Sequence, residues 1–336
     1  MEQSLNNRFA AVRPLIGHTP LLEIDYTFCG KPRRLFAKAE YYNLTGSIKD
    51  RVALYILEKA YKNGTLHPGD TIAEATSGNT GISFSALGRY LGHPVTIYMP
   101  NWMSRERIAL MESFGATVHL VSAEEGGFLG SIKMTEMLAE KGNVFLPRQF
   151  SNEDNTMAHV EGTAAEIIEQ LESCGLVPHG VVAGVGTGGT IMGLARGLRM
   201  KNPSCKAFPL EPANSPTLST GYKTGKHRIY GISDEFIPDI VKLDELDKIV
   251  SVDDGDAICM ARLLSETLGV GVGVSGGANF LGCVLAQEIL GKDAVLVTVF
   301  ADDNKKYLST DYAIRQHPQP DSLTAAICLK GMKAIH

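Results

Sequence analysis

The chain has 336 residues, enough for two compact domains or one large α/β unit. Hydrophobic residues make up 44% and charged residues 21%, a balance that excludes an intrinsically disordered chain. The formal net charge is −5, and Lys and Arg residues form no stripe. We therefore expect neither a nucleic-acid partner nor an anionic membrane surface as a partner.

The sequence contains no signal for a membrane or for secretion. No run approaches the roughly 18 apolar residues of a transmembrane helix, and residues 1–17 lack the pattern of a signal peptide. The six cysteines form no CxxC pair, which argues against a disulfide framework and against a thiolate metal site. We expect a cytoplasmic protein that binds no metal.

Short apolar runs alternate with helical patterns along the chain. In the first half the predicted strands are residues 35–39, 71–75, 94–99, 117–121 and 144–146, with apolar residues at helical spacing in 52–61, 108–114 and 132–138. In the second half the predicted strands are 180–185, 205–210, 248–252, 269–274 and 294–300, and the predicted helices are 189–200, 254–268 and 278–290. Residues 215–238 are less regular and are expected to loop over a site.

This alternation predicts an α/β fold of two domains, each a mostly parallel twisted sheet with helices on both faces. The composition changes at residues 149–157, so the predicted domains are 1–155 and 156–310, with a cleft between them. Part of 1–40 is expected to cross to the second domain. Residues 311–336 form a tail, which we expect to be a small helix that docks on a partner subunit.

Three loops that follow predicted strands have the composition of ligand sites, because ligands of such sheets bind beyond the carboxyl ends of the strands. The first, NLTGSIKDR at 43–51, places Lys49 in the first turn of a helix. The helix dipole disfavours a cation there, and a solvated surface lysine gains nothing from that place. An imine-forming lysine, by contrast, must be able to lose its proton.

The second loop, TSGNTG at 76–81, combines hydroxyl residues and glycines at a helix start. Such a loop can present several backbone N–H groups to a carboxylate. A plain N-cap needs only one of these residues, so the whole run favours an anion site.

The third loop, GVGTGGT at 184–190, also opens a helix and suits a phosphate group. Its glycines satisfy GxGxxG, and Glu211 ends the next strand as in a dinucleotide-binding fold. This loop alone leaves both interpretations open.

Together the loops resemble the cysteine synthase and cystathionine β-synthase family, the pyridoxal-phosphate enzymes of fold type II, which include tryptophan synthase β. The likeness covers roughly residues 15–310. It rests on IGHTPL at 16–21, the three loops above, Glu211-Pro212 and KYLST at 306–310. Several motifs in the right order are more specific than GxGxxG, and they decide against the dinucleotide interpretation.

The resemblance implies a role for each matching residue. Lys49 is similar to the lysine that carries pyridoxal 5'-phosphate as a Schiff base, Asn79 to the side chain that binds the 3′-oxygen, and Ser275 to the serine at the pyridine nitrogen. The implied phosphate site consists of Gly186, Thr187, Gly188, Gly189 and Thr190. The implied substrate site consists of Thr76, Ser77, Gly78, Thr80, Gln149 and Gly231.

The activity implied by this family is β-replacement on a serine- or cysteine-derived amino acid through an aminoacrylate, as when O-acetylserine and sulfide give cysteine. Lys49 is the natural base for the Cα proton. The alternative is an enzyme that consumes cysteine and releases hydrogen sulfide, with water or an amino acid as nucleophile and serine, lanthionine or cystathionine as product. More remote alternatives are a dinucleotide-binding oxidoreductase and an inactive binding homologue. Small amino acids as substrates and a homodimer are also implied.

One departure from the family pattern bears on the nucleophile. Residues 231–236 read GISDEF where sulfide-using members usually read GIGAGF, which places Asp234 in a loop that lines the substrate cleft. As a catalytic residue, Asp234 would act as a general base or would repel hydrosulfide. As a structural residue, it would be a solvated acid in a turn.

Overall fold

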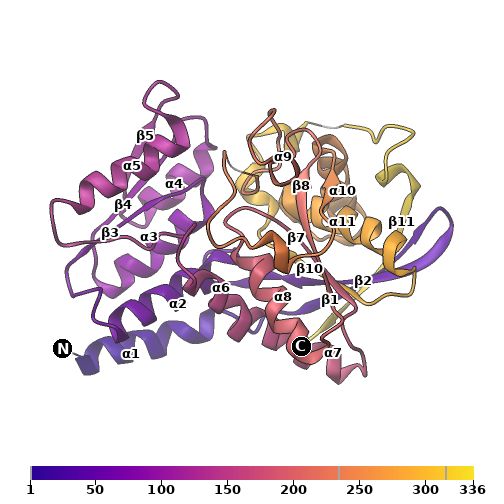
Figure 1. Cartoon of the computed structure of the whole chain (residues 1–336), viewed down its shortest axis with the longest axis horizontal. Coiled ribbons are helices and arrows are strands. Elements are labelled where there is room, and N and C mark those ends of the chain that lie inside the picture. Colours follow the sequence, from indigo (N-terminus) through magenta and orange to yellow (C-terminus); the bar gives the residue numbers. More distant parts are fainter. Residues whose placement is uncertain (1, 234, 315) are drawn as a thin grey trace.

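The computed structural model describes residues 2–233, 235–314 and 316–336, and these residues form two sheets with helices around them (Figure 1). The larger sheet has seven strands in the order β11-β1-β2-β10-β7-β8-β9, and the smaller sheet has four in the order β5-β4-β3-β6. All pairings are parallel except those of β1 with β2 and with β11. The predicted fold class is thus confirmed.

The smaller unit is built from four of the five strands predicted in the first half, and the fifth, at residues 35–39, belongs to the larger sheet. Its strands are β3 (Thr71–Ala75), β4 (Val95–Pro100), β5 (Thr117–Val121) and β6 (Val144–Phe145). Its helices are α1 (Glu2–Val12), α2 (Lys49–Lys62), α3 (Asn79–Leu91), α4 (Arg105–Ser113) and α5 (Gly127–Ala139). Apolar side chains of α1, α2 and α3 pack with those of β3 and β4 in one core cluster. Apolar residues at helical spacing lie on one face of each helix, and that face is the one that packs on the sheet.

The larger unit contains the remaining strands. They are β1 (Leu21–Phe28), β2 (Lys31–Ala39), β7 (Gly180–Gly184), β8 (Lys206–Pro212), β9 (Val250–Val252), β10 (Leu296–Phe300) and β11 (Ile327–Ile335). The helices are α6 (Asp154–Ala158), α7 (Ala165–Ser173), α8 (Gly189–Lys201), α9 (Thr217–Thr220), α10 (Asp254–Leu268) and α11 (Val274–Leu290). Two separate core clusters involve this sheet, one with α10 and α11 and the other with α7 and α8.

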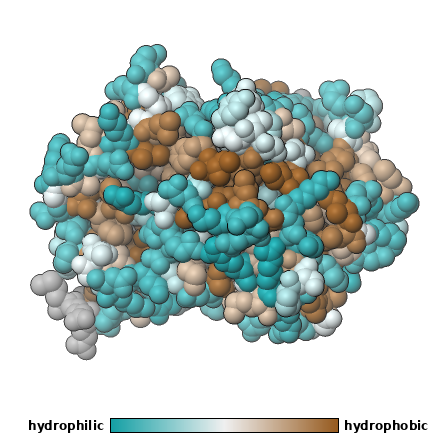
Figure 2. All heavy atoms as spheres, in the orientation of Figure 1, coloured by the Kyte–Doolittle hydropathy of each residue, from teal (hydrophilic) through white to brown (hydrophobic). Residues whose placement is uncertain are grey.

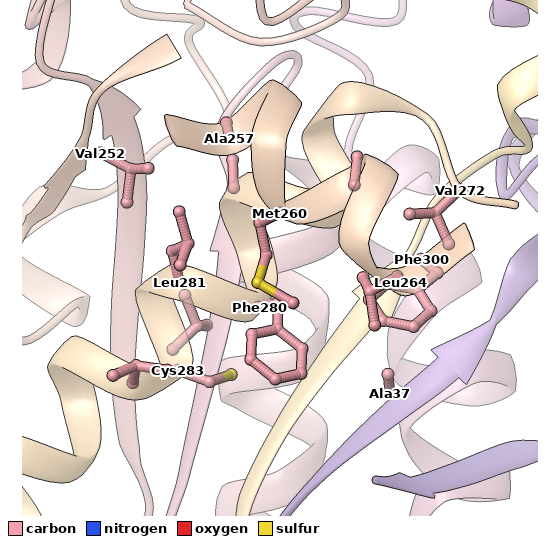
Figure 3. Close-up of a cluster of buried hydrophobic side chains, with 14 of the residues drawn as sticks. Ala37, Val252, Ala257, Met260, Leu264, Val272, Phe280, Leu281, Cys283 and Phe300 are labelled. Carbon is pink, nitrogen blue, oxygen red and sulfur yellow. The ribbon is translucent and has the colours of Figure 1, made fainter. Parts of the chain in front are cut away.

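Close packing of the first of these clusters is visible in Figure 3, where Met260 and Leu264 of α10 lie near Phe280 of α11. All three side chains are fully buried. Figure 2 shows that hydrophilic side chains predominate on the face in view and that hydrophobic ones gather in separate patches. No described helix is long and apolar enough to cross a membrane.

Two expectations about local structure are wrong. Residues 269–274 form no strand: α10 ends at Leu268, Gly269 caps it with φ +69°, and α11 already begins at Val274. Only Val272 makes an isolated bridge, to Asp303. The tail does not end in a docking helix either, because β11 pairs with β1 at the edge of the larger sheet. An apolar run too short for periodicity does not separate a strand from a buried loop.

Candidate active site

The three predicted loops meet in one pocket between the two units, at the carboxyl ends of β3 and β7. Its lining includes most of the predicted site residues, namely Lys49, Thr76, Ser77, Asn79, Thr80, Gln149, Gly186, Thr187, Gly188, Thr190, Gly231 and Ser275. Gly78 and Gly189 belong to the same loops but do not line the pocket. Asp234 lies outside the residues that the structure describes.

Lys49 is the first residue of α2, and its side chain reaches from the smaller unit to the glycine-rich loop of the larger one. Its Nζ lies 3.5 Å from Thr187 Oγ1. The loop before it is fixed to the end of β10, since Ile48 N donates to Ala301 O at 2.8 Å. An amine and the predicted phosphate loop therefore lie side by side.

The glycine-rich loop joins β7 to α8 with little space for side chains. Gly188 has φ +90°, and a Cβ atom at that position would meet Val241 Cγ2 at 2.2 Å. A Cβ at Gly186 would meet Gly231 O at 2.2 Å. Backbone N–H groups at the start of a helix attract an anion, and glycines allow it to come close. The geometry fits a phosphate group.

His159 contacts the helix start that follows this loop, and its role was not predicted from the sequence. Its Nε2 lies 3.3 Å from Thr190 Oγ1 and its Nδ1 lies 3.0 Å from Thr163 Oγ1. Burial, together with the charge of Lys49, holds the pKa of His159 well below its ordinary value, so the imidazole is neutral. It lies in a π-helical turn at residues 159–164, a feature often found at functional sites.

The second loop is held in place by Gln149, a residue distant from it in the sequence. Gln149 Oε1 accepts a hydrogen bond from Thr80 Oγ1 at 2.6 Å, and its Nε2 donates to Ala75 O at 2.7 Å. Thr76 Oγ1 accepts from Gly78 N at 3.0 Å, which shapes the turn into α3. The loop and Gln149 thus form one polar surface that suits a carboxylate.

A buried acid, Glu74, holds the two parts of this surface together. Its carboxyl oxygens accept from Ala75 N at 2.9 Å and from Gln149 N at 3.2 Å. Burial raises the pKa of Glu74 from 4.5 to about 8, despite these backbone donors. The folded protein therefore keeps a proton that the unfolded chain loses above about pH 4.5.

This shift predicts a pH-dependent stability. The contribution of Glu74 to the free energy of unfolding is fully present below about pH 4.5, where Glu74 is protonated in both the folded and the unfolded state. This contribution is lost as the pH rises toward 8. Glu74→Gln does not titrate, so we expect its free energy of unfolding to fall less between pH 5 and 8.5 than that of the wild type. Urea unfolding at several pH values measures this, with exposed Glu140→Gln as the control. Parallel pH profiles for Glu74→Gln and wild type would refute the assignment.

A polar group at the opposite wall has unmet hydrogen-bonding capacity. Asn79 Nδ2 donates to Asp302 Oδ2 at 2.7 Å, and Tyr307 OH donates to the same oxygen at 2.6 Å. Asn79 Oδ1 and Asp302 Oδ1 are buried and have no hydrogen-bond partner. Ser275, in the first turn of α11, also lines this wall. A bound molecule with polar edges would complete these contacts.

An ion-pair network fixes α2, and with it Lys49, to the larger unit. The Arg51 guanidinium donates to both oxygens of Glu40, next to β2, and to both oxygens of Glu166 in α7. Burial alone would raise the pKa of Glu166. The hydrogen bonds and charge of Arg51, together with the charge of Lys38, instead hold this pKa at about 2. Such bidentate pairs are rigid, so they restrict the position of the helix start.

The family model described as "Pyridoxal-phosphate dependent enzyme" matches residues 12–302. A protein of Bacillus subtilis (strain 168) named "Probable cysteine synthase" is 40% identical over 298 residues, which cover 88% of this chain and 95% of that protein.

Two solved structures have a higher sequence identity to this chain. The crystal structure of a hydrogen sulfide-producing enzyme from Fusobacterium nucleatum has a TM-score of 0.94 and 56% sequence identity, and the match covers 97% of both chains. A variant of that enzyme with asparagine in place of one aspartate, solved in complex with an α-aminoacrylate intermediate, has a TM-score of 0.95. It is 56% identical, and the match covers 96% of this chain and 97% of that one.

Proposed function

Because the chain belongs to the pyridoxal-phosphate dependent enzyme family, we propose that it replaces the β-substituent of a serine- or cysteine-derived amino acid, as a cysteine synthase does. The observation that carries this proposal is Lys49 Nζ beside Thr187 of the glycine-rich loop, at 3.5 Å. The main reaction is formation of cysteine from O-acetylserine and sulfide.

The residues of the pocket fit pyridoxal phosphate. The backbone at Gly186 and Gly188, where no side chain fits, would hold its phosphate. Asn79 Oδ1 is buried without a hydrogen-bond partner, so a polar group of the cofactor could bind there. Lys49 would form the covalent link, and Ser275 would meet the pyridine nitrogen. This favours the cofactor over a dinucleotide at the loop formed by residues 184–190.

When bound, pyridoxal phosphate withdraws electrons from the Cα atom of an attached amino acid. The residues of this chain supply position and proton transfer. Thr76, Ser77, Thr80 and Gln149 would hold the substrate carboxylate. Lys49 would take the Cα proton, because it lies beside the loop that would fix the phosphate. Loss of the β-substituent and addition of a nucleophile at Cβ complete the exchange.

The solved structures described above favour a second reaction. The Fusobacterium nucleatum enzyme, at 56% identity, is named for hydrogen sulfide production. We propose that this chain also consumes cysteine and releases sulfide, with water or an amino acid as nucleophile. The experiment is to incubate the purified holoenzyme with O-acetylserine plus sulfide, and separately with cysteine alone, and to identify all products. We expect cysteine in the first and sulfide in the second, whereas no product in either would refute β-replacement.

Asp234 is our proposed base for the incoming nucleophile. The Fusobacterium nucleatum enzyme was solved with one aspartate replaced by asparagine and in complex with an α-aminoacrylate intermediate. This complex supports a role for an aspartate after that intermediate has formed. In Asp234→Asn, we expect one equivalent of sulfide per active site from cysteine, followed by turnover slowed roughly 10²–10⁴-fold. A sulfide electrode measures both phases. Continuous sulfide release at the wild-type rate would show that Asp234 is not the base.

We propose a cytoplasmic homodimer without a nucleic-acid partner, because the family resemblance implies a dimer and the net charge of −5 disfavours nucleic acid. Small amino acids are its substrates.

A further inference from the structure

The cleft contains a second cation that the proposed roles leave unused. Arg107 of α4 is only 2% exposed, and it lines the same pocket as Lys49 and Thr76. Its Nη1 donates to Ser104 Oγ at 3.1 Å. Its guanidinium carbon lies 4.6 Å from the ring centre of Tyr307 and 5.3 Å from that of Tyr230. It thus contacts a neutral hydroxyl and two aromatic rings, and it forms no ion pair with a described residue.

The adjacent acid, Glu106, feels the charge of Arg107, which helps to lower its pKa, but it forms no close ion pair with Arg107. Glu106 accepts from Ser309 N at 2.9 Å and from Ser309 Oγ at 2.6 Å. It therefore anchors the segment after Tyr307. A buried guanidinium without a carboxylate costs desolvation energy that the stacking on tyrosine offsets only in part.

Packing alone does not explain an arginine at this position. Its stem lies under the turn at Gly78, where a Cβ atom would meet Arg107 Cδ at 2.2 Å. A leucine or methionine could fill that space without burying a charge. The charged end lies beyond the stem, among Ser104, Tyr230 and Tyr307, and Tyr230 directly precedes Gly231 of the cleft loop. The pocket therefore has a cation in addition to the polar surface formed by the loop at 76–81 and Gln149.

We propose that Arg107 binds the carboxylate of the second reactant, so that the enzyme accepts carboxylate-bearing thiols, such as an amino-acid thiol, in addition to hydrosulfide. A planar guanidinium binds a carboxylate through two parallel hydrogen bonds, and stacking on tyrosine keeps its plane fixed. In the exchange, the bond from Cβ to the leaving group X breaks and a carbon–sulfur bond forms. The thiol proton leaves with X as HX, so no oxidant or reductant is needed. This inference rests on the proposed β-replacement.

The test uses two thiols of equal length, 3-mercaptopropionate and its neutral amide, with O-acetylserine as donor and thioether formation as the readout. In the wild-type holoenzyme we expect kcat/KM to be roughly 10- to 100-fold higher for the acid than for the amide, the range of a charged hydrogen bond. In Arg107→Gln this ratio should fall to about one. Arg107→Lys keeps the charge but loses the planar fork, so its ratio should lie between the two.

Arg105→Gln is the matched control, because Arg105 lies on the same helix and is exposed. It should keep the wild-type ratio. An equal ratio in wild type and Arg107→Gln, in an enzyme that makes cysteine from hydrosulfide, would overturn this inference alone. A wild-type enzyme that forms no product with any thiol, hydrosulfide included, would overturn the proposed function and this inference with it.

Discussion

Lys49→Ala is expected to abolish turnover while the fold survives. Loss of proton transfer alone costs roughly 10²–10⁴-fold, and loss of the covalent link to the cofactor adds to that. The fold should persist because Lys49 is only the first residue of α2, and the start of that helix is held by Arg51 through Glu40 and Glu166. Turnover of cysteine and of O-acetylserine, with circular dichroism of the same samples, measures both effects.

Lys62→Ala provides the matched control, since Lys62 is the last residue of α2 and is exposed. We expect wild-type turnover from it. Turnover in Lys49→Ala at more than a tenth of the wild-type rate would show that another group performs the proton transfer.

Gly188→Asp is expected to prevent binding of pyridoxal phosphate. Position 188 has φ +90°, and any Cβ there would collide with Val241 Cγ2 at 2.2 Å. The added carboxylate would also repel the cofactor phosphate. We expect the dissociation constant of pyridoxal phosphate, measured by fluorescence titration of the apoenzyme, to rise at least ~100-fold, which corresponds to about 2.7 kcal/mol.

Gly175→Asp separates this effect from backbone strain. Gly175 also has a positive φ, +68°, but nothing lies within 4 Å of a Cβ at that position. It should bind the cofactor like the wild type. Unchanged affinity in Gly188→Asp, or tight binding of NAD by the wild type, would contradict the assignment of this loop.

Local sequence patterns predicted the parallel strands and the loops that follow them. β3 and β5 have the predicted bounds, and α10 spans the predicted residues 254–268. β1 was missed, although its burial alternates over Leu22, Ile24 and Tyr26. β11 was misread as a helix because its strand partner, β1, is some 300 residues away in the sequence. Pairing over such a separation leaves no local signal beyond a short alternation.

The site shows the same limit. Lys49, the loop at 76–81 and the loop at 184–190 each carry a local motif, and the pocket brings all three together. The side chains that support them were not predicted. Glu74, His159 and Asp302 act through contacts made only after folding, and single residues of these types carry no pattern in a sequence. Arg107 was missed for the same reason.

The proposed reaction depends most directly on a covalent bond between Lys49 and pyridoxal phosphate. Borohydride reduction of the purified holoenzyme, followed by proteolysis and mass spectrometry, locates the reduced cofactor on a single peptide. We predict a peptide that contains residues 43–51, with the added mass on Lys49. Stoichiometric cofactor on any other lysine, or none on a fully active enzyme, would contradict the role of Lys49.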